Sequence, residues 1–446
     1  MNKDITSGTI WKQILVFFFP ILFGTFFQQL YNTVDTILVG QFVGKEALSA
    51  VSGAPAMLVS LIVGFFVGLS SGATVIISQY YGSDDTKSVS VAAHTGVVFS
   101  IIGAALLSVI GYFASGWFLR LCRVPEDIFA ESLIYMQIFF LGLIGTFLYN
   151  MGASILRAIG DSKRPFYFLI IGCLLNIVLD VIFLIPLKMG VAGAAYATVI
   201  SQAVSALLTL ICLFKETGPC KLELPKLRME KLSLLKILRI GLPAGIQSVT
   251  YALSNLIIQA SINDFGTDVI AAWGVYGKMD TVFWLAMSSF GMALTTFVGQ
   301  NYGAGKYDRV RKGIKDTGIM ASIAAVMICS ILFIKAEFFF SLFTPDQAVI
   351  QTGVRMLHFL MPTYVLYVYI EVLSGGLRAM GDTFLPMLFC CGGICGIRIV
   401  WTLLVCPLYP TIEMLELNFT VSWANTLVLF IIYYYIKRKK LMPDLN

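Results

Sequence analysis

Long apolar segments recur along nearly the whole chain, separated by short polar stretches. Each has about 20 residues or more, which is the length needed to cross a hydrocarbon core of roughly 30 Å. The longer segments are expected to emerge into water at their ends. The twelve predicted spans are 10–36, 46–79, 86–113, 128–156, 165–187, 191–214, 233–262, 268–303, 309–334, 347–377, 383–407 and 417–437. The pattern therefore predicts an all-α integral membrane protein with twelve transmembrane helices.

Composition agrees with this prediction. Of 446 residues, 58% are hydrophobic and only 13% are charged, which is too little polar surface to cover a soluble globule. The first apolar segment is long and has no small-residue cleavage site before the second. It is therefore expected to be a retained helix rather than a cleaved signal peptide.

Lysine and arginine are distributed unevenly between the loops. They gather in the linker after the sixth span, in the loop after the eighth and in the tail 437–440, whereas the opposite side has few. Basic loops stay in the cytoplasm, so both termini are expected to be cytoplasmic. This asymmetry accounts for the net charge of +6, and nucleic-acid binding is not needed to explain it. The opposite side holds Lys45, Arg120, Arg123, Lys188 and Lys335.

The chain contains an internal duplication with a period of about 221 residues. The run Leu156 to Ser162 (LRAIGDS) aligns with Leu377 to Thr383 (LRAMGDT), and Gln79 to Gly82 aligns with Gln300 to Gly303. Six helices per copy make the repeats parallel, a design in which transporters bind substrate between the two halves. A duplicated scaffold without transport stays open as the alternative. The predicted organisation is an N-terminal lobe 1–214, a basic linker 215–232 and a C-terminal lobe 233–446.

Two carboxylates lie at positions where the two copies of the duplication have different residues. Asp35 in the first span has an apolar counterpart near Ile258, and Asp180 in the fifth span aligns with Trp401. A charge in the hydrocarbon region costs about 3 kcal/mol or more unless it is paired, solvated or protonated. Both residues are therefore functional candidates. The alternative for Asp35 is that it caps a helix end before Gly40 and faces water.

Two further polar residues are expected at the same depth. Asn176 lies four residues before Asp180 and hence on the same helix face, and Thr198 lies early in the sixth span. Together with Asp35 they offer the oxygen ligands that a small cation such as Na⁺ prefers. The same group could bind H⁺. A structural pair between Asp180 and Asn176 stays open.

The C-terminal half carries its own charges inside apolar segments, and they are expected to neutralise one another. Depth along the helices favours Asp280 over Glu371 as the partner of Arg398. A structural ion pair and a role in ion coupling both stay open. The four residues of this group are Lys278, Asp280, Glu371 and Arg398.

Other candidates follow from the prolines and polar residues of the helices. Pro20 and Pro243 interrupt the first helix of each half and permit a kink. His94 and His358 have no ligand residues at suitable spacing and are expected to be packed or interfacial. The nine cysteines are interpreted as core residues. The candidates for the substrate cavity or hinge are Pro20, Gln28, Tyr31, Asn32 and Asn150.

Three of these features together resemble the multidrug and toxic compound extrusion (MATE) family over nearly the whole chain. They are the polar run of the first helix from Pro20 to Asp35, the Gln-x-Tyr-Gly ends of the second and eighth helices, and the duplicated Leu-Arg-Ala-x-Gly-Asp turn. The resemblance implies two six-helix lobes arranged as a V. It also implies multidrug efflux, the export of cationic or amphipathic compounds in exchange for H⁺ or Na⁺.

The DinF-like branch of the family has its coupling site in the N-terminal lobe, and the resemblance places that site at Asp35, Asn176, Asp180 and Thr198, with Pro20 as the proline that bends helix one. The acids that the NorM-like branch uses in helices seven and ten have no clear match. We expect a monomeric, multi-pass protein of a bacterial inner (plasma) membrane. It should be neither an enzyme nor dependent on a cofactor apart from its coupling ion.

Three other functions remain to be separated from export. A flippase for lipid-linked oligosaccharides or lipids would share the duplicated lobes, although only Lys278 and Arg398 offer a cationic cavity. An enzyme would need a nucleophile, a metal cluster or paired acids at a water interface, and the pair Asp35 and Asp180 is the nearest candidate. A channel would need a ring of repeated filter residues, which the sequence does not show.

Overall fold

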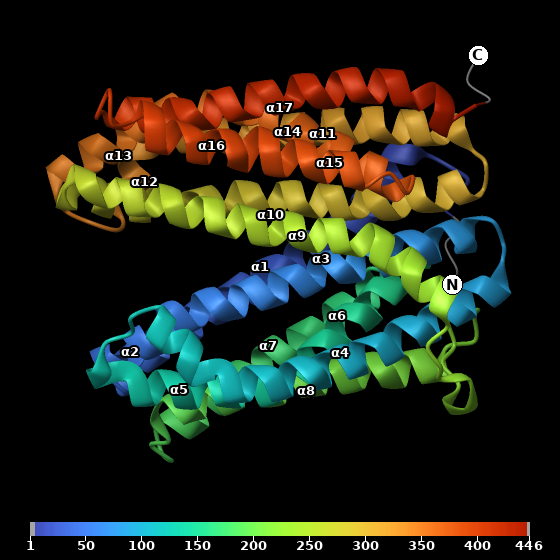
Figure 1. Ribbon diagram of the computed structural model, residues 1–446, viewed down its shortest axis with the longest axis horizontal. Helices are drawn as coiled ribbons and strands as arrows, with labels where there is room; N and C mark the ends of the chain where they lie inside the picture. Colours follow the sequence, from blue (N-terminus) through green and yellow to red (C-terminus); the bar gives the residue numbers. More distant parts are fainter. Residues whose placement is uncertain (1–4, 444–446) are drawn as a thin grey trace. The chain divides into compact units, whose positions relative to one another are not determined.

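The structure is a computed structural model that describes residues 5–443, and all of the regular elements in that range are helical (Figure 1). Three short 3-10 turns (η1–η3) and two π-helical segments (η4, η5) accompany seventeen α-helices. The bounds are α1 Ile10–Phe42, α2 Lys45–Ser52, α3 Ala54–Gly82, α4 Thr86–Leu121, α5 Glu126–Leu141, α6 Leu143–Ala158, α7 Lys163–Leu184, α8 Gly190–Lys215, η1 Leu224–Lys226, α9 Lys231–Ile262, η2 Asn263–Phe265, α10 Thr267–Gly303, α11 Tyr307–Ile334, α12 Ala336–Ser341, α13 Gln347–Leu360, η3 Met361–Thr363, α14 Tyr364–Ala379, α15 Phe384–Leu388, η4 Phe389–Gly396, α16 Ile397–Val400, η5 Trp401–Val405 and α17 Ile412–Leu441.

The predicted spans are confirmed as a set. Eleven helical segments in the described part of the chain are long and apolar enough to cross a membrane. The twelfth is the pair α5 and α6, which is bent by 47° at Gly142. Several helices are longer than the sequence predicted, and α1 continues to Phe42 rather than ending near residue 36. The fold class predicted from the sequence is therefore correct.

Packing divides the chain into two compact units, and each division point lies inside a long helix. The first unit takes 19–245 and the second takes 5–18 and 246–443 of the described residues. The division falls next to Pro20 in α1 and close to Pro243 in α9, the two prolines that occupy equivalent positions in the duplication. The lobes and linker predicted from the sequence, 1–214, 215–232 and 233–446, stay a prediction.

Small residues bring α3 and α9 into close contact within the first unit. A Cβ added at Gly72 would lie 2.3 Å from the backbone oxygen of Ile237, and one at Gly68 would lie 2.6 Å from the backbone nitrogen of Gly245. Backbones can approach this closely only where side chains are absent. Gly68 and Gly72 stand four residues apart, a spacing that places both on one face of α3.

The duplication extends to backbone geometry at the ends of α6 and α14. Gly160 has a φ of +95° and Gly381 a φ of +89°, a region that favours glycine. The N–H of each donates to the carbonyl three residues back at 2.9 Å, and the next residue, Asp161 or Asp382, donates to the carbonyl five residues back at 3.0 Å. The two copies therefore end these helices with the same turn, as the repeated sequence implies.

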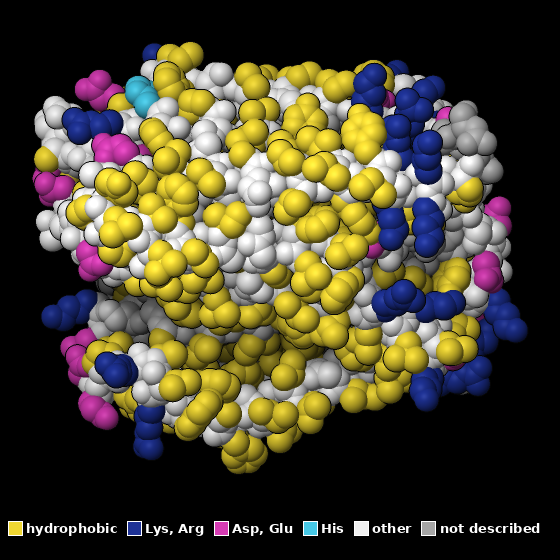
Figure 2. All heavy atoms as spheres, turned by 45° about the horizontal axis from the view of Figure 1, so that its top comes forward, with side chains coloured by type: hydrophobic (Ala, Val, Ile, Leu, Met, Phe, Trp, Pro, Cys, Tyr) yellow, Lys and Arg dark blue, Asp and Glu magenta, His cyan; other side chains and the backbone are white. Residues whose placement is uncertain are grey.

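The surface is apolar along the middle of the helices. Figure 2 shows hydrophobic side chains over this middle zone, with lysine and arginine gathered toward one end of the face in view. Large apolar side chains such as Phe113, Ile334 and Leu404 are more than half exposed. Exposed apolar surface on this scale is compatible with a lipid environment.

Candidate cation-coupling site and substrate cavity

The first unit buries two carboxylates and an amide, and most of their polar atoms have no hydrogen-bond partner in residues 5–443. Asp35 is 8% exposed, Asn176 is 1% exposed and Asp180 is fully buried. Among the described residues no group bonds to Oδ1 of Asp35, to either carboxylate oxygen of Asp180 or to either polar atom of Asn176. Buried polar atoms are normally satisfied, so this cluster requires a physical explanation.

The members of this cluster come from different helices but lie within reach of one another's charge. Asp35 is on α1, whereas Asn176 and Asp180 are one turn apart on α7. The carboxylates of Asp35 and Asp180 interact electrostatically, and both act on the hydroxyl of Tyr135 on α5. The structure thus brings together the two acids that are 145 residues apart in sequence.

A small cavity lies beside these residues, and Thr198 forms part of its wall. Tyr31, Asn176 and Thr198 line it, and its volume of about 10 Å³ is the size of one water molecule. The hydroxyl of Tyr31 is hydrogen-bonded to the side chains of Gln28 and Gln202. The helices α1, α7 and α8 therefore surround a small polar cavity next to the buried acids.

The capping alternative for Asp35 is wrong. The helix α1 continues seven residues past Asp35 to Phe42, so the carboxylate lies in a helix interior. Its buried side chain also does not face water. Likewise, a hydrogen bond from Asn176 to Asp180 is absent, because the polar atoms of both side chains have no partner in residues 5–443.

The candidates for the substrate cavity or hinge lie in different surroundings. Gln28 is half-buried next to Tyr31, whereas Asn32 is exposed. Asn150 donates its amide to the carbonyl of Thr146 on its own helix at 2.8 Å, so this donor is already satisfied. Pro20 lies inside the continuous helix α1.

In the second unit, Arg398 acts electrostatically on Asp280, but the two side chains do not form the direct ion pair expected from the sequence in residues 5–443. Asp280 accepts hydrogen bonds from the Tyr364 hydroxyl and from Nε1 of Trp284. Arg398 is 4% exposed, and no carboxylate of the described residues lies within 4.0 Å of it. Both side chains instead line one cavity of about 450 Å³.

The remaining two charges of this group lie apart from that cavity. Glu371 accepts from the hydroxyl of Tyr367 at 3.2 Å and touches α10, where a Cβ at Gly291 would lie 2.4 Å from its Oε1. Lys278 is exposed on α10. Neither forms an ion pair with any residue in the described range.

One buried acid was missed from the sequence. Glu416 on α17 is 2% exposed, and its Oε1 has no partner in the described chain. The last span was predicted to start at residue 417, so Glu416 was assigned to a loop, whereas α17 begins at Ile412. An acid that directly precedes an apolar run was the available signal.

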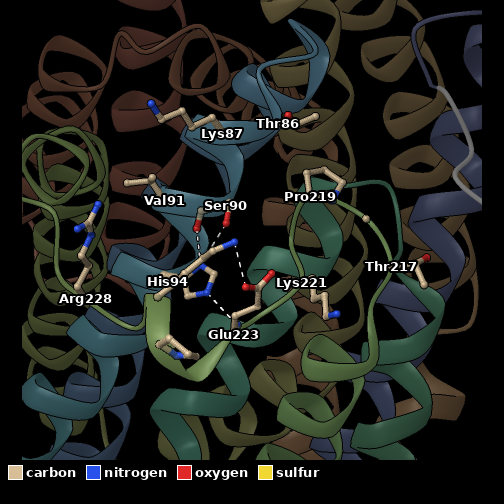
Figure 3. A pocket seen from close by; sticks show the side chains of 13 residues that line it. Thr86, Lys87, Ser90, Val91, His94, Thr217, Pro219, Lys221, Glu223 and Arg228 are labelled. Atoms are coloured by element: carbon tan, nitrogen blue, oxygen red, sulfur yellow. Dashed lines mark hydrogen bonds and ion pairs between the residues drawn. The ribbon is translucent and has the colours of Figure 1, made fainter.

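A second cavity lies at the basic end of the first unit, between α4 and the segment that follows α8 (Figure 3). Its volume is about 610 Å³. His94, 2% exposed, accepts a hydrogen bond at Nε2 from the backbone N–H of Glu223, and its Nδ1 bonds the carbonyl of Ser90 (Figure 3). Lys226 pairs with Glu223 at 3.0 Å and holds the pKa of that carboxyl below its usual value. His94 is therefore packed against the linker, as predicted.

Comparisons with known proteins agree with this fold. The family model described as MatE matches the chain twice, at residues 20–182 and 243–404. The probable multidrug resistance protein YoeA of Bacillus subtilis is 28% identical and covers 99% of this chain and 96% of its own length. A second protein of the same organism, the probable multidrug resistance protein YpnP, is 30% identical over 85% of this chain and 84% of its own.

Solved structures show the same architecture. A MATE transporter in complex with MaL6 has a TM-score of 0.93 at 20% identity, with 99% of each chain covered. A MOP superfamily transporter from Pyrococcus furiosus has a TM-score of 0.92 at 21% identity, covering 99% of this chain and 98% of its own. The two family matches begin at Pro20 and Pro243, the equivalent prolines of the duplication, and they span more than half of the sequence. The chain therefore belongs to the MATE family of membrane transporters.

Proposed function

We propose that this protein is a secondary active antiporter that exports small organic compounds, cationic or amphipathic in character, in exchange for H⁺ or Na⁺ by alternating access. The observation that carries the proposal is the buried cluster of Asp35, Asn176 and Asp180, in which four side-chain oxygens have no partner in the described part of the chain. Relatives named as multidrug resistance or multidrug export proteins support export as the activity.

The cluster fits a coupling site because its charge changes when a cation binds. Two carboxylates that repel each other in a dry environment are stabilised by a proton or by Na⁺. Side-chain oxygens of Asn176 and Thr198 can complete the ligand set of a hard cation. Because Asp35 and Asp180 belong to different helices, a bound cation would favour one relative position of α1 and α7.

The same reasoning gives the mechanism of exchange. Cation binding at Asp35 and Asp180 shifts α1, with Pro20 as its bending point, and this change in the first unit displaces the substrate. A ligand shifts a conformational equilibrium only by its difference in affinity for the two states. We infer a monomer in a bacterial plasma membrane with its basic loops in the cytoplasm.

Efflux from proteoliposomes tests the proposal. Ethidium efflux is measured with an imposed pH gradient or an imposed Na⁺ gradient for the wild type, Asp35→Asn and Asp180→Asn. Efflux that follows one gradient and is lost in both variants is expected. The matched control is Asp346→Asn, since Asp346 is an exposed cap of α13 and asparagine also caps helices.

The other outcomes are equally informative. Coupled efflux that persists in both Asp35→Asn and Asp180→Asn would contradict the coupling site. No efflux under either gradient, from protein that still folds, would favour a flippase of lipid-linked oligosaccharides or a narrower substrate range.

A further inference from the structure

The cavity of the second unit is lined mainly by aromatic side chains. At about 450 Å³ it falls in the range of roughly 300–1,000 Å³ that is usual for small-molecule sites. Flat rings are good partners for aromatic walls because ring pairs gain energy beyond their buried area. Its aromatic residues are Tyr251, Trp273, Tyr276, Trp284, Tyr364, Tyr367 and Phe419.

Arg398 supplies this cavity with a positive charge, and no carboxylate of residues 5–443 lies within 4.0 Å of it. Its Nε donates to the hydroxyl of Ser422 at 3.3 Å, and the guanidinium lies 4.2 Å from the ring centroid of Phe419 and 5.4 Å from that of Trp423. An arginine has five N–H donors and recognises carboxylates in a bidentate manner. The stacked rings fix the orientation of the guanidinium, and they cannot replace a carboxylate as acceptors.

Asp280 supplies the same cavity with a negative charge. The two hydrogen bonds that it accepts come from neutral donors, Tyr364 and Trp284, so its charge is also not neutralised by a lysine or arginine within 4.0 Å in residues 5–443. Both charges therefore lie on the wall of one cavity, where they act on each other only from beyond ion-pair distance. A ligand that carries both a cation and a carboxylate matches this arrangement.

The backbone around Arg398 is also irregular. Arg398 lies on the single turn α16, between the π-helical segments η4 and η5. Such segments are rare and are frequent at functional sites, because each widens the helix and redirects the side chains that follow. The carbonyl of Arg398 accepts from the amide of Asn418 at 3.2 Å, which fixes this turn against α17.

We propose that Arg398 is a specificity-determining residue that binds the carboxylate of aromatic zwitterions, while Asp280 faces their cationic part. This deepens the proposed export function, on which it rests, by naming a substrate class for the second unit. Truncating one member of a buried charge pair weakens binding strongly, because the other charge stays behind without a partner.

The test is equilibrium binding to the purified full chain in detergent, read by fluorescence anisotropy. Rhodamine 110 has a free carboxylate and a delocalised cation, and rhodamine 123 is its methyl ester with the same cation. The wild type is expected to bind rhodamine 110 at least about tenfold more tightly than rhodamine 123. Because no gradient is involved, failure of ion coupling and failure of this inference are distinguishable.

Variants test whether the preference for rhodamine 110 depends on Arg398. Arg398→Gln is expected to remove this preference by weakening the binding of rhodamine 110 alone, and Arg398→Lys is expected to keep part of the preference. Asp280→Asn should weaken the binding of both dyes. Arg378→Gln, at an arginine outside the cavity, is the matched control and should leave both affinities unchanged.

Three results would overturn the proposal. The wild type binds the ester as tightly as the acid, or binds neither dye, or Arg398→Gln weakens both dyes equally. If Arg398→Gln does not fold, as judged by size-exclusion chromatography, the comparison of Arg398→Lys with the wild type decides. A reduced preference for rhodamine 110 with an unchanged affinity for rhodamine 123 supports recognition of the carboxylate by Arg398. An unchanged preference, or an equal loss for both dyes, contradicts it.

Discussion

The backbone N–H of Glu223 donates a hydrogen bond to Nε2 of His94 at 3.0 Å, across 129 residues of sequence. His94 can accept at Nε2 because its Nδ1 donates to the carbonyl of Ser90 at 2.7 Å. A second bond, from the N–H of Glu230 to the hydroxyl of Thr95 at 3.2 Å, follows on the same helix. The segment between α8 and α9 is thus held against α4 by hydrogen bonds to two consecutive residues of that helix.

Removing the histidine should release this segment. His94→Ala deletes one hydrogen bond of about 1 kcal/mol, which changes a local opening equilibrium about fivefold. Limited trypsin digestion at 215–232 is expected to be about fivefold faster, because cleavage follows the open population. Lys87→Gln is the control, since Lys87 lines the same cavity without holding the linker (Figure 3). Equal cleavage rates in wild type and His94→Ala would contradict the anchoring role.

The glycine contact between α3 and α9 predicts a stability difference. In Gly72→Ala the new Cβ would lie 2.3 Å from the backbone oxygen of Ile237, so two helices must separate. Overpacking of this kind costs about 1–3 kcal/mol, and the midpoint of thermal unfolding in detergent should fall. Gly103→Ala on α4 is the control, because no described atom beyond the neighbouring residues and backbone of its own helix lies within 4 Å of its added Cβ. If both variants unfold at the same temperature, close packing at Gly72 is not important for stability.

The fold was largely predictable from the sequence, because the length of an apolar segment and the prolines and glycines that recur in both copies can be found from the local sequence alone. Twelve spans, the duplicated turn and the burial of Asp35 and Asp180 were found in this way. The surroundings of Arg398 were not found in this way. Counting residues along a helix gives depth but not direction around the axis, and the π-helical segments on either side of Arg398 alter that direction. Glu416 was missed because helix ends are set by caps, here Thr411, rather than by hydropathy.

The duplicated turn predicts equal effects at two distant positions. Gly160→Ala and Gly381→Ala each place a side chain at a φ near +90°, which costs about 1–3 kcal/mol. Both should lower the midpoint of thermal unfolding by a similar amount, because the turns have the same hydrogen bonds. Gly274→Ala, at a helical glycine with open space around it, should not lower the midpoint, because alanine favours the helix. A large effect at one position and none at the other would mean that the two copies use this turn differently.

Glu230 predicts how the start of α9 responds to acid. Its carboxylate accepts from the backbone N–H of Ser233 and from that of Leu232, and the bond to Ser233 contributes most to lowering its pKa below the usual 4.5. A group whose pKa is depressed in the fold stabilises that fold above its unfolded pKa, and this contribution is lost as the pH falls through the folded pKa.

The first turn of α9 should therefore loosen below about pH 4.5 and be unaffected above it. Hydrogen exchange of a peptide containing Ser233, corrected for the intrinsic dependence of exchange on pH, measures this directly. Glu230→Gln has no carboxylate to titrate, and its protection should be lower than that of the wild type at pH 7 and independent of pH. Protection that falls equally with pH in both proteins would assign the acid response to another group.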